Sequence, residues 1–268
     1  MRNIVRSELI RIWRPSFLYG GIGVMAGFAA LVSVFIYVSA PTTTAATAQQ
    51  PGPAAQFAAT VAQIAQPGGF LTALATVSTL AGIILLALWA LSAASDYSTG
   101  VIRILVQAEP KRIKLLTGKM AALLLFTLFA TVNTTLIVVL VARPLARLQG
   151  IQTQAWKTDF FPHLFSGYAN FTIAAIVWGL IGLALAVLTR SSALAIGIGV
   201  GYLLVVENLI GIIAPDATPY LPGGTLNALV SGGTTELAWL PALGLTLLYG
   251  AVAASISLVA FHRRDIIS

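Results

Sequence analysis

The chain has 268 residues, of which 58% are hydrophobic and only 9% are charged, and it carries a formal net charge of +7. A soluble domain has about 25% charged residues, so this composition, with a mean hydropathy of +0.92, excludes an ordinary soluble protein. The basic residues cluster at the ends of apolar stretches, where they set orientation and meet lipid headgroups, and this placement argues against a nucleic-acid-binding protein.

The first predicted element, within residues 1–15, is a helix lying in the membrane interface. Arg2 and Arg6 fall off its apolar stripe, and Pro15 ends it or turns it into the first span. The apolar residues at helical spacing are Val5, Leu9, Ile12 and Trp13. The alternative is a basic flank that only sets topology.

Six stretches approach or exceed the roughly 20 apolar residues that cross a bilayer. They predict a single transmembrane domain, an all-α polytopic fold with six transmembrane helices. The predicted spans are residues 17–38, 70–94, 120–141, 167–188, 193–214 and 238–261.

Three connections on one side of these spans carry further predictions. Within residues 41–69, Pro53–Ala65 is read as a short helix or, equally, as a disordered linker. Residues 143–166 mix charges with aromatic side chains, which is typical of an interfacial anchor. Residues 215–236 are too broken to span but could dip into the bilayer as a re-entrant segment around Leu226–Val230.

The remaining connection of note is a charged island, Asp96–Lys119, between two uncharged apolar stretches. Gly100 permits a turn after the second span, and Val101–Glu109 then reads as a short helix that Pro110 ends. A compact charged loop of this kind is usually offered to something soluble.

Counting Lys and Arg sets the predicted orientation. One side, with the charged island and both termini, holds twelve of them, and the other holds only Arg143, Arg147 and Lys157. The positive-inside rule therefore predicts a plasma-membrane or inner-membrane protein with both termini in the cytoplasm. The twelve are Arg2, Arg6, Arg11, Arg14, Arg103, Lys111, Arg112, Lys114, Lys119, Arg190, Arg263 and Arg264.

The sequence offers no catalytic site. Gly118-Lys119 lacks the glycine of a phosphate-binding P-loop five residues earlier. His163 and His262 have no partners at metal-ligand spacing, and there is no cysteine, so we expect no metal site and no cofactor on this chain.

Glu207 is the one Asp, Glu, Lys or Arg within the predicted spans. An ionised carboxylate near the membrane centre costs at least about 2.5 kcal/mol, so it must face protein or water, or be protonated. It is therefore a candidate for the translocation path, as a substrate contact or gate. The alternative is a carboxyl group paired with Asn208 or Tyr202 across helices.

Two glycine pairs, Gly23-x-x-x-Gly27 and Gly197-x-x-x-Gly201, allow close approach of helices. They could form the seam of a dimer or pack the monomer. We expect packing within the monomer.

The charged island resembles the conserved loop of ABC-2 type transporter permeases. The span number, the loop placement, the tight turn at Leu188-Thr189-Arg190-Ser191 and the closing Phe261–Ile266 resemble that family as well. The matching pieces of the loop are Ser95–Gly100, Ile102–Leu105, Glu109–Arg112 and Leu115–Lys119.

The resemblance implies a subunit that pairs with a second permease copy, here expected as a homodimer, and docks on separate ATPase subunits that bind Mg-ATP. It implies a coupling helix at Gly100–Glu109, with Ile102, Leu105 and Val106 as buried anchors on the ATPase. Arg103 and Glu109 would orient it, and a second ATPase contact would come from Arg6, Leu9 and Trp13.

We therefore expect a permease subunit of an ATP-driven ABC exporter for a lipophilic drug, peptide or lipid. Two alternatives remain open. One is a secondary, proton-coupled transporter centred on Glu207, and the other is a non-transporting scaffold that recruits a soluble partner.

Overall fold

The computed structural model describes residues 2–12, 15–42, 59–101, 104, 107 and 112–263. Within these residues the chain is built from helices and forms no β-strand beyond an isolated bridge between Gly233 and Ala238. Six of the described helices are long and apolar enough to cross a membrane, which confirms an all-α, multi-pass membrane protein. These spans are Tyr19–Thr42, Gly69–Ser98, Ile113–Leu148, Phe160–Thr189, Ser192–Ile213 and Trp239–Arg263.

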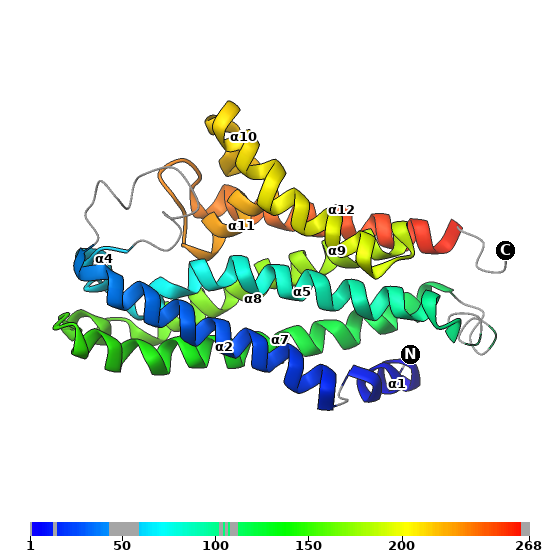
Figure 1. Cartoon of the computed structure of the whole chain (residues 1–268), viewed down its shortest axis with the longest axis horizontal. Helices are drawn as coiled ribbons and strands as arrows, with labels where there is room; N and C mark the ends of the chain where they lie inside the picture. The colour runs from blue at the N-terminus through cyan, green and yellow to red at the C-terminus, as the bar shows by residue number, and fades with distance from the viewer. Residues whose placement is uncertain are drawn as a thin grey trace.

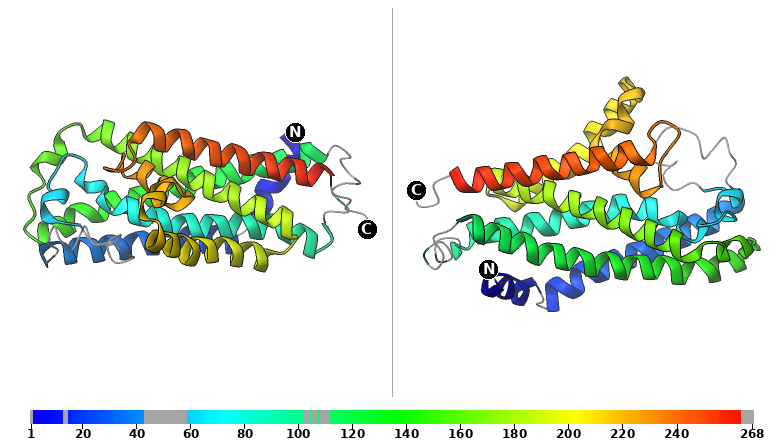
Figure 2. Two further views of the ribbon diagram at one scale, coloured as in Figure 1. Left: turned by 90° about the horizontal axis from the view of Figure 1, so that it is seen from above. Right: turned by 180° about the vertical axis from the view of Figure 1, so that it is seen from behind.

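Five long helices run side by side along the length of the molecule (Figure 1). One end of the bundle, which we call the basal end, is the end that the sequence predicts to face the cytosol. It contains helix α1 (Arg2–Ile12), the end of α5, the start of α7 and the last turn of α12 (Figures 1 and 2). Helix α4 (Val61–Ile64) lies at the opposite, distal end. The five are α2 (Pro15–Ser39), α5 (Thr72–Ser98), α7 (Arg112–Leu148), α8 (Phe160–Thr189) and α12 (Trp239–Arg263).

The core is the contact between α5 and α8, where two tryptophans lie on glycines of the facing helix. A Cβ atom on Gly82 would stand 2.3 Å from the Trp178 ring, and one on Gly179 would stand 2.5 Å from the ring of Trp89. Gly182 lies closer still, since its Cβ would be 2.2 Å from the carbonyl oxygen of Leu86. Small residues let helix backbones approach where lipid supplies no hydrophobic drive.

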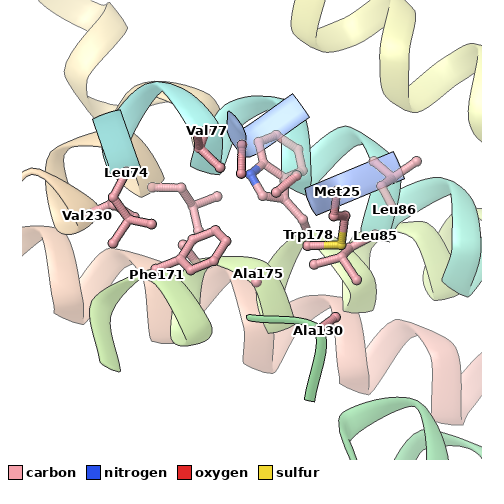
Figure 3. Packing of buried hydrophobic residues seen from close by; sticks show 14 of the residues in the cluster. Met25, Leu74, Val77, Leu85, Leu86, Ala130, Phe171, Ala175, Trp178 and Val230 are labelled. Carbon is pink, nitrogen blue, oxygen red and sulfur yellow. The ribbon is translucent and has the colours of Figure 1, made fainter. Parts of the chain in front are cut away.

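Around this contact the buried side chains of several helices interdigitate, as Figure 3 shows for Met25 of α2 beside Leu85 of α5 and Trp178 of α8. The cluster continues towards the distal end through Phe171 and Val230. One apolar core therefore joins the helices into a single bundle.

The glycine pairs pack differently from the prediction. A Cβ atom on Gly23, Gly27, Gly197 or Gly201 would meet nothing within 4 Å, so the expectation that they pack the monomer is wrong. The close approaches fall at Gly82, Gly179 and Gly182 instead, because α5 and α8 are the most deeply buried pair of spans.

The predicted interfacial anchor at residues 143–166 is shorter and more buried than expected. Helix α7 continues to Leu148, and α8 begins at Phe160. Trp156 is buried and donates a hydrogen bond to the carbonyl oxygen of Ile64 at 2.7 Å. Phe160 stacks on Phe70 with ring centroids 4.7 Å apart, so Trp156 and Phe160 pack within the bundle. Phe161 and Phe165, the other two aromatics of the predicted anchor, are 76% and 73% exposed.

At the distal end, the described part of the predicted helix Pro53–Ala65 is helical only over Val61–Ile64, and residues 53–58 lie outside the described residues. Thr60 begins the helix with a capping box, since its side chain accepts from the Gln63 backbone N–H and the Gln63 side chain accepts from the Thr60 N–H.

The fifth span is one helix with a π-helical segment in its middle, and it leans away from the bundle (Figure 1). Helix α9 (Ser192–Gly201) passes through a π-helical segment, η5 (Tyr202–Val206), into α10 (Glu207–Ile213), which projects outward (Figure 1). Ile212 and Ile213 are 79% and 81% exposed. The segment predicted to dip into the bilayer forms α11 (Pro222–Val230), which packs against α12, α8 and α5.

Candidate functional site: a ring of ion pairs at the basal end

Four charged side chains from three helices form a closed ring of ion pairs at the basal end, which we call the basal ring. Arg11 bonds Glu8 at 3.1 Å and Asp96 at 2.6 Å. Lys119 closes the ring, with its Nζ atom 2.8 Å from Asp96 and 3.1 Å from Glu8. The ring contains two acids and two bases, so its formal charges cancel.

The basal ring is largely withdrawn from solvent. Glu8, Asp96 and Lys119 are buried, and Arg11 is half-buried. Lys119 also donates to the carbonyl oxygen of Ser92 at 3.0 Å. Desolvation opposes the charge on Arg11, but hydrogen bonds and charges from Asp96 and Glu8 outweigh it and raise the pKa of Arg11. Buried charges of this kind persist only when each has a partner, because an unpaired buried ion costs several kcal/mol.

A small cavity of about 20 Å³ adjoins the ring, which is room for about one water molecule. Val187 of α8 and Phe261 of α12 reach this cavity, so the ring lies where five helices converge. The cavity wall consists of Glu8, Ala93, Asp96, Tyr97, Leu115, Leu116, Lys119, Val187 and Phe261.

The basal ring lies on both sides of the charged island in the sequence. Asp96 lies in the last turn of α5, and Lys119 lies in the third turn of α7, so their ion pair ties together the two helices that flank the charged island. Arg11 and Glu8 add α1 to the same clamp. The ring therefore connects α1 to both helices that flank the island.

The start of the island agrees with the predicted turn. Helix α5 ends at Ser98, and Gly100 has φ +69°, a left-handed conformation that glycine adopts without strain. Val101, Ile104 and Gln107 are helical, and Ile104 is 66% exposed. The predicted ATPase contacts Ile102, Arg103, Leu105, Val106 and Glu109 lie outside the described residues.

The predicted second ATPase contact is divided by the structure. Arg6 is exposed on α1, whereas Leu9 is half-buried and packs against the core of the bundle. Trp13 lies outside the described residues. Of the two that the structure describes, Arg6 is the one with an exposed side chain.

Sequence reasoning missed the basal ring itself. Arg11 was considered only as a charge that sets topology, Asp96 and Lys119 as the ends of the charged island, and Glu8 was not singled out. A signal was present, because Glu8 falls on the same helical stripe as Val5 and Ile12. A carboxylate on the apolar face of a helix needs a buried cationic partner.

Glu207 lies elsewhere, at the start of α10, and it too is buried. Its Oε1 atom accepts a hydrogen bond from the backbone N–H of Gly223 at 2.8 Å, and it also bonds the side chain of Tyr202. Asn208, the other partner considered, donates instead to the carbonyl oxygen of Leu204 at 2.9 Å. The carboxylate therefore joins the fifth span to the N-terminus of α11, where the helix dipole favours negative charge.

A comparison with known protein families finds a match that covers most of the chain. Residues 28–267 match the family described as "Protein of unknown function (DUF2705)". The chain belongs to this family. The match takes in all six spans apart from the first turns of α2. Of the three helices that form the basal ring, α5 and α7 lie wholly inside the match, with Asp96 and Lys119, whereas α1, with Glu8 and Arg11, precedes it. No curated protein matches the chain.

Proposed function

We propose that this DUF2705 member is the membrane subunit of an ATP-driven ABC transporter, with its basal end in the cytoplasm and docked on a separate ATPase. The basal ring carries the proposal. It fixes the two helices that flank residues 99–111 to each other and to α1, through ion pairs of 2.6–3.1 Å. A segment held on a rigid base can convert closure of a soluble motor into movement of helices.

Three further observations support this function. Ile104, 66% exposed, offers an apolar side chain for docking on a soluble partner. The excess of Lys and Arg at the basal end favours a cytoplasmic location in a plasma or inner membrane. The loop motifs resemble those of ABC-2 permeases, in which Mg-ATP is bound by the partner subunit.

The proposal includes a second copy of this chain. Gly23 and Gly27 of α2, and Gly197 and Gly201 of α9, have open space where a side chain would lie, so another helix could approach closely there. The cargo that suits the apolar spans is a lipophilic drug, peptide or lipid moving outward.

Affinity purification of the full chain from its native membranes tests the function. We expect an ATPase to co-purify and its turnover to respond to cargo. Ile104→Asp and Leu105→Asp should each reduce the amount of ATPase recovered by about tenfold, as expected for loss of an apolar anchor. Both variants should insert into the membrane normally.

Phe161→Asp is the matched control, because Phe161 is 76% exposed but lies at the distal end. It should leave ATPase recovery unchanged. Recovery of a partner without nucleotide hydrolysis would instead identify a scaffold. Normal assembly and transport by both island variants would contradict the docking assignment.

A further inference from the structure

A second feature lies at the distal end and has no part in the proposed coupling. A cavity of about 700 Å³ opens among the end of α2, α4, the start of α5, the start of α8 and α11. This volume is within the range of about 300–1,000 Å³ that is typical of small-molecule sites. It is far larger than the cavity beside the basal ring.

The polar groups that line this cavity share one property: each can both donate and accept hydrogen bonds. They are carboxamides, hydroxyls and one imidazole, and none of the described lining residues is Asp, Glu, Lys or Arg. The polar lining residues are Gln63, Gln66, Thr72, Thr76, His163, Ser166, Asn170, Asn227 and Ser231.

The walls of the cavity are held by contacts behind them. Asn170 is 7% exposed, and its Oδ1 atom accepts a hydrogen bond from the indole N–H of Trp239 at 3.1 Å. Tyr37 donates to the carbonyl oxygen of Gly69 at 3.1 Å. Gly68, with φ +80°, turns the chain beside His163, whose ring would lie 3.2 Å from a Cβ atom there. These contacts fix Asn170 and the turn at Gly68–Gly69 in place before any ligand arrives.

We propose that the distal cavity is a binding site for an uncharged ligand rich in amide groups, such as a short neutral peptide. A charged ligand would lose hydration without finding a counter-charge on the described walls. Four of the nine polar side chains are carboxamides, which carry N–H donors and a carbonyl oxygen with two lone pairs. The oxygens of Gln63, Asn170 and Asn227 each accept one hydrogen bond within the chain, so the N–H groups and the second lone pair would meet the amide groups of a ligand. Apart from His163, the described lining has no aromatic ring on which a sugar could stack.

The site goes beyond the proposed transport role, and its test needs no ATPase. The chain has no cysteine, so single cysteines report on it without background. The full chain carrying Ser231→Cys or Ser166→Cys, in phosphatidylcholine nanodiscs, would be labelled with a small maleimide. The probe is the doubly capped peptide acetyl-Ser-Asn-Gly-Ser-amide, compared with capped peptides in which Asp or Lys replaces Ser, and with maltose.

We expect the neutral peptide, at ten times its dissociation constant, to slow labelling at both positions by about tenfold. The control Thr158→Cys is exposed and close to the same end but outside the lining, so its labelling should not change. The acidic peptide, the basic peptide and maltose should protect much less.

Two second-site variants test the contribution of the carboxamides. Asn227→Leu combined with Ser166→Cys, and Asn170→Leu combined with Ser231→Cys, should abolish protection while the labelling rate without peptide stays at the parental value; Asn227 is not combined with position 231 because the two side chains are hydrogen-bonded to each other. If Asn170→Leu disturbs folding, Asn227→Leu, at a half-buried position, still decides. Absence of protection by the neutral peptide, equal protection by charged peptides or preferential protection by maltose would each overturn the proposal.

Discussion

The two ends of the bundle differ in charge and in packing. At the basal end, four charged side chains from α1, α5 and α7 cancel in a closed ring beside a cavity of about 20 Å³. At the distal end, uncharged amides and hydroxyls surround about 700 Å³ of open space. The first arrangement fixes helices to one another, and the second leaves room for a ligand. The two ends therefore differ in charge, in the space they enclose and in what they could bind.

Substitutions in the basal ring should have the largest effect on stability. Lys119→Ala would leave Glu8 and Asp96 with Arg11 as their remaining partner in the ring, so we expect a loss of about 3–5 kcal/mol in the free energy of unfolding. The double variant Asp96→Leu/Lys119→Leu should recover much of that loss, because apolar residues often replace a buried ion pair without cost.

Thermal unfolding of the purified chain in detergent measures both effects. Asp216→Ala and Glu236→Ala are the controls, because these acids are exposed and should have little effect on stability. A Lys119→Ala protein as stable as the parent would show that the ring does not clamp the helices.

The α5–α8 contact, which connects the two ends, gives the next largest effect. The Cβ atom of Gly182→Ala would stand 2.2 Å from the Leu86 carbonyl oxygen, which cannot move without its helix. We expect destabilisation of about 1–3 kcal/mol from overpacking, read as a lower midpoint of thermal unfolding. Gly197→Ala is the matched control, because a Cβ atom there would meet no other atom within 4 Å. Its midpoint of thermal unfolding should equal that of the parent. Equal melting of the two variants would mean that α5 and α8 are not in close contact.

Glu207 gives a smaller and more local effect. Glu207→Gln keeps an acceptor for the Gly223 N–H but removes the charge, so we expect that hydrogen bond to weaken by about 1 kcal/mol. Amide hydrogen exchange in α11 should rise about fivefold, while exchange in α5 and α8 stays at the parental rate.

The same variant separates two classes of transporter. Under the proposed function, Glu207→Gln retains transport and its dependence on ATP. Loss of transport with normal ATPase binding would favour a proton-coupled carrier centred on this carboxylate.

The fold was largely predictable from the sequence, because crossing a bilayer demands long apolar helices and each of the six is marked by composition. The lengths were less predictable. Arg143 and Arg147 read as loop residues, yet α7 continues through both to Leu148, since helix ends in a membrane protein need not coincide with the edges of apolar stretches.

The basal ring could not be derived in the same way. Asp96 and Lys119 are 23 residues apart, and Glu8 is 88 residues before Asp96, so their meeting depends on how α1, α5 and α7 pack. Hydropathy patterns report which face of a helix is apolar but not which helix covers it. The distal cavity could not be predicted for the same reason, because its polar residues come from four separate segments.

The location of Ile104 tests the central claim most directly. In the cysteine-free chain, Ile104→Cys would be exposed to a membrane-impermeant maleimide, first in intact cells and then in inverted membrane vesicles. We expect no labelling in cells, rapid labelling in vesicles, and protection in vesicles when the co-purifying ATPase is added back. Labelling of position 104 from outside intact cells would contradict the account.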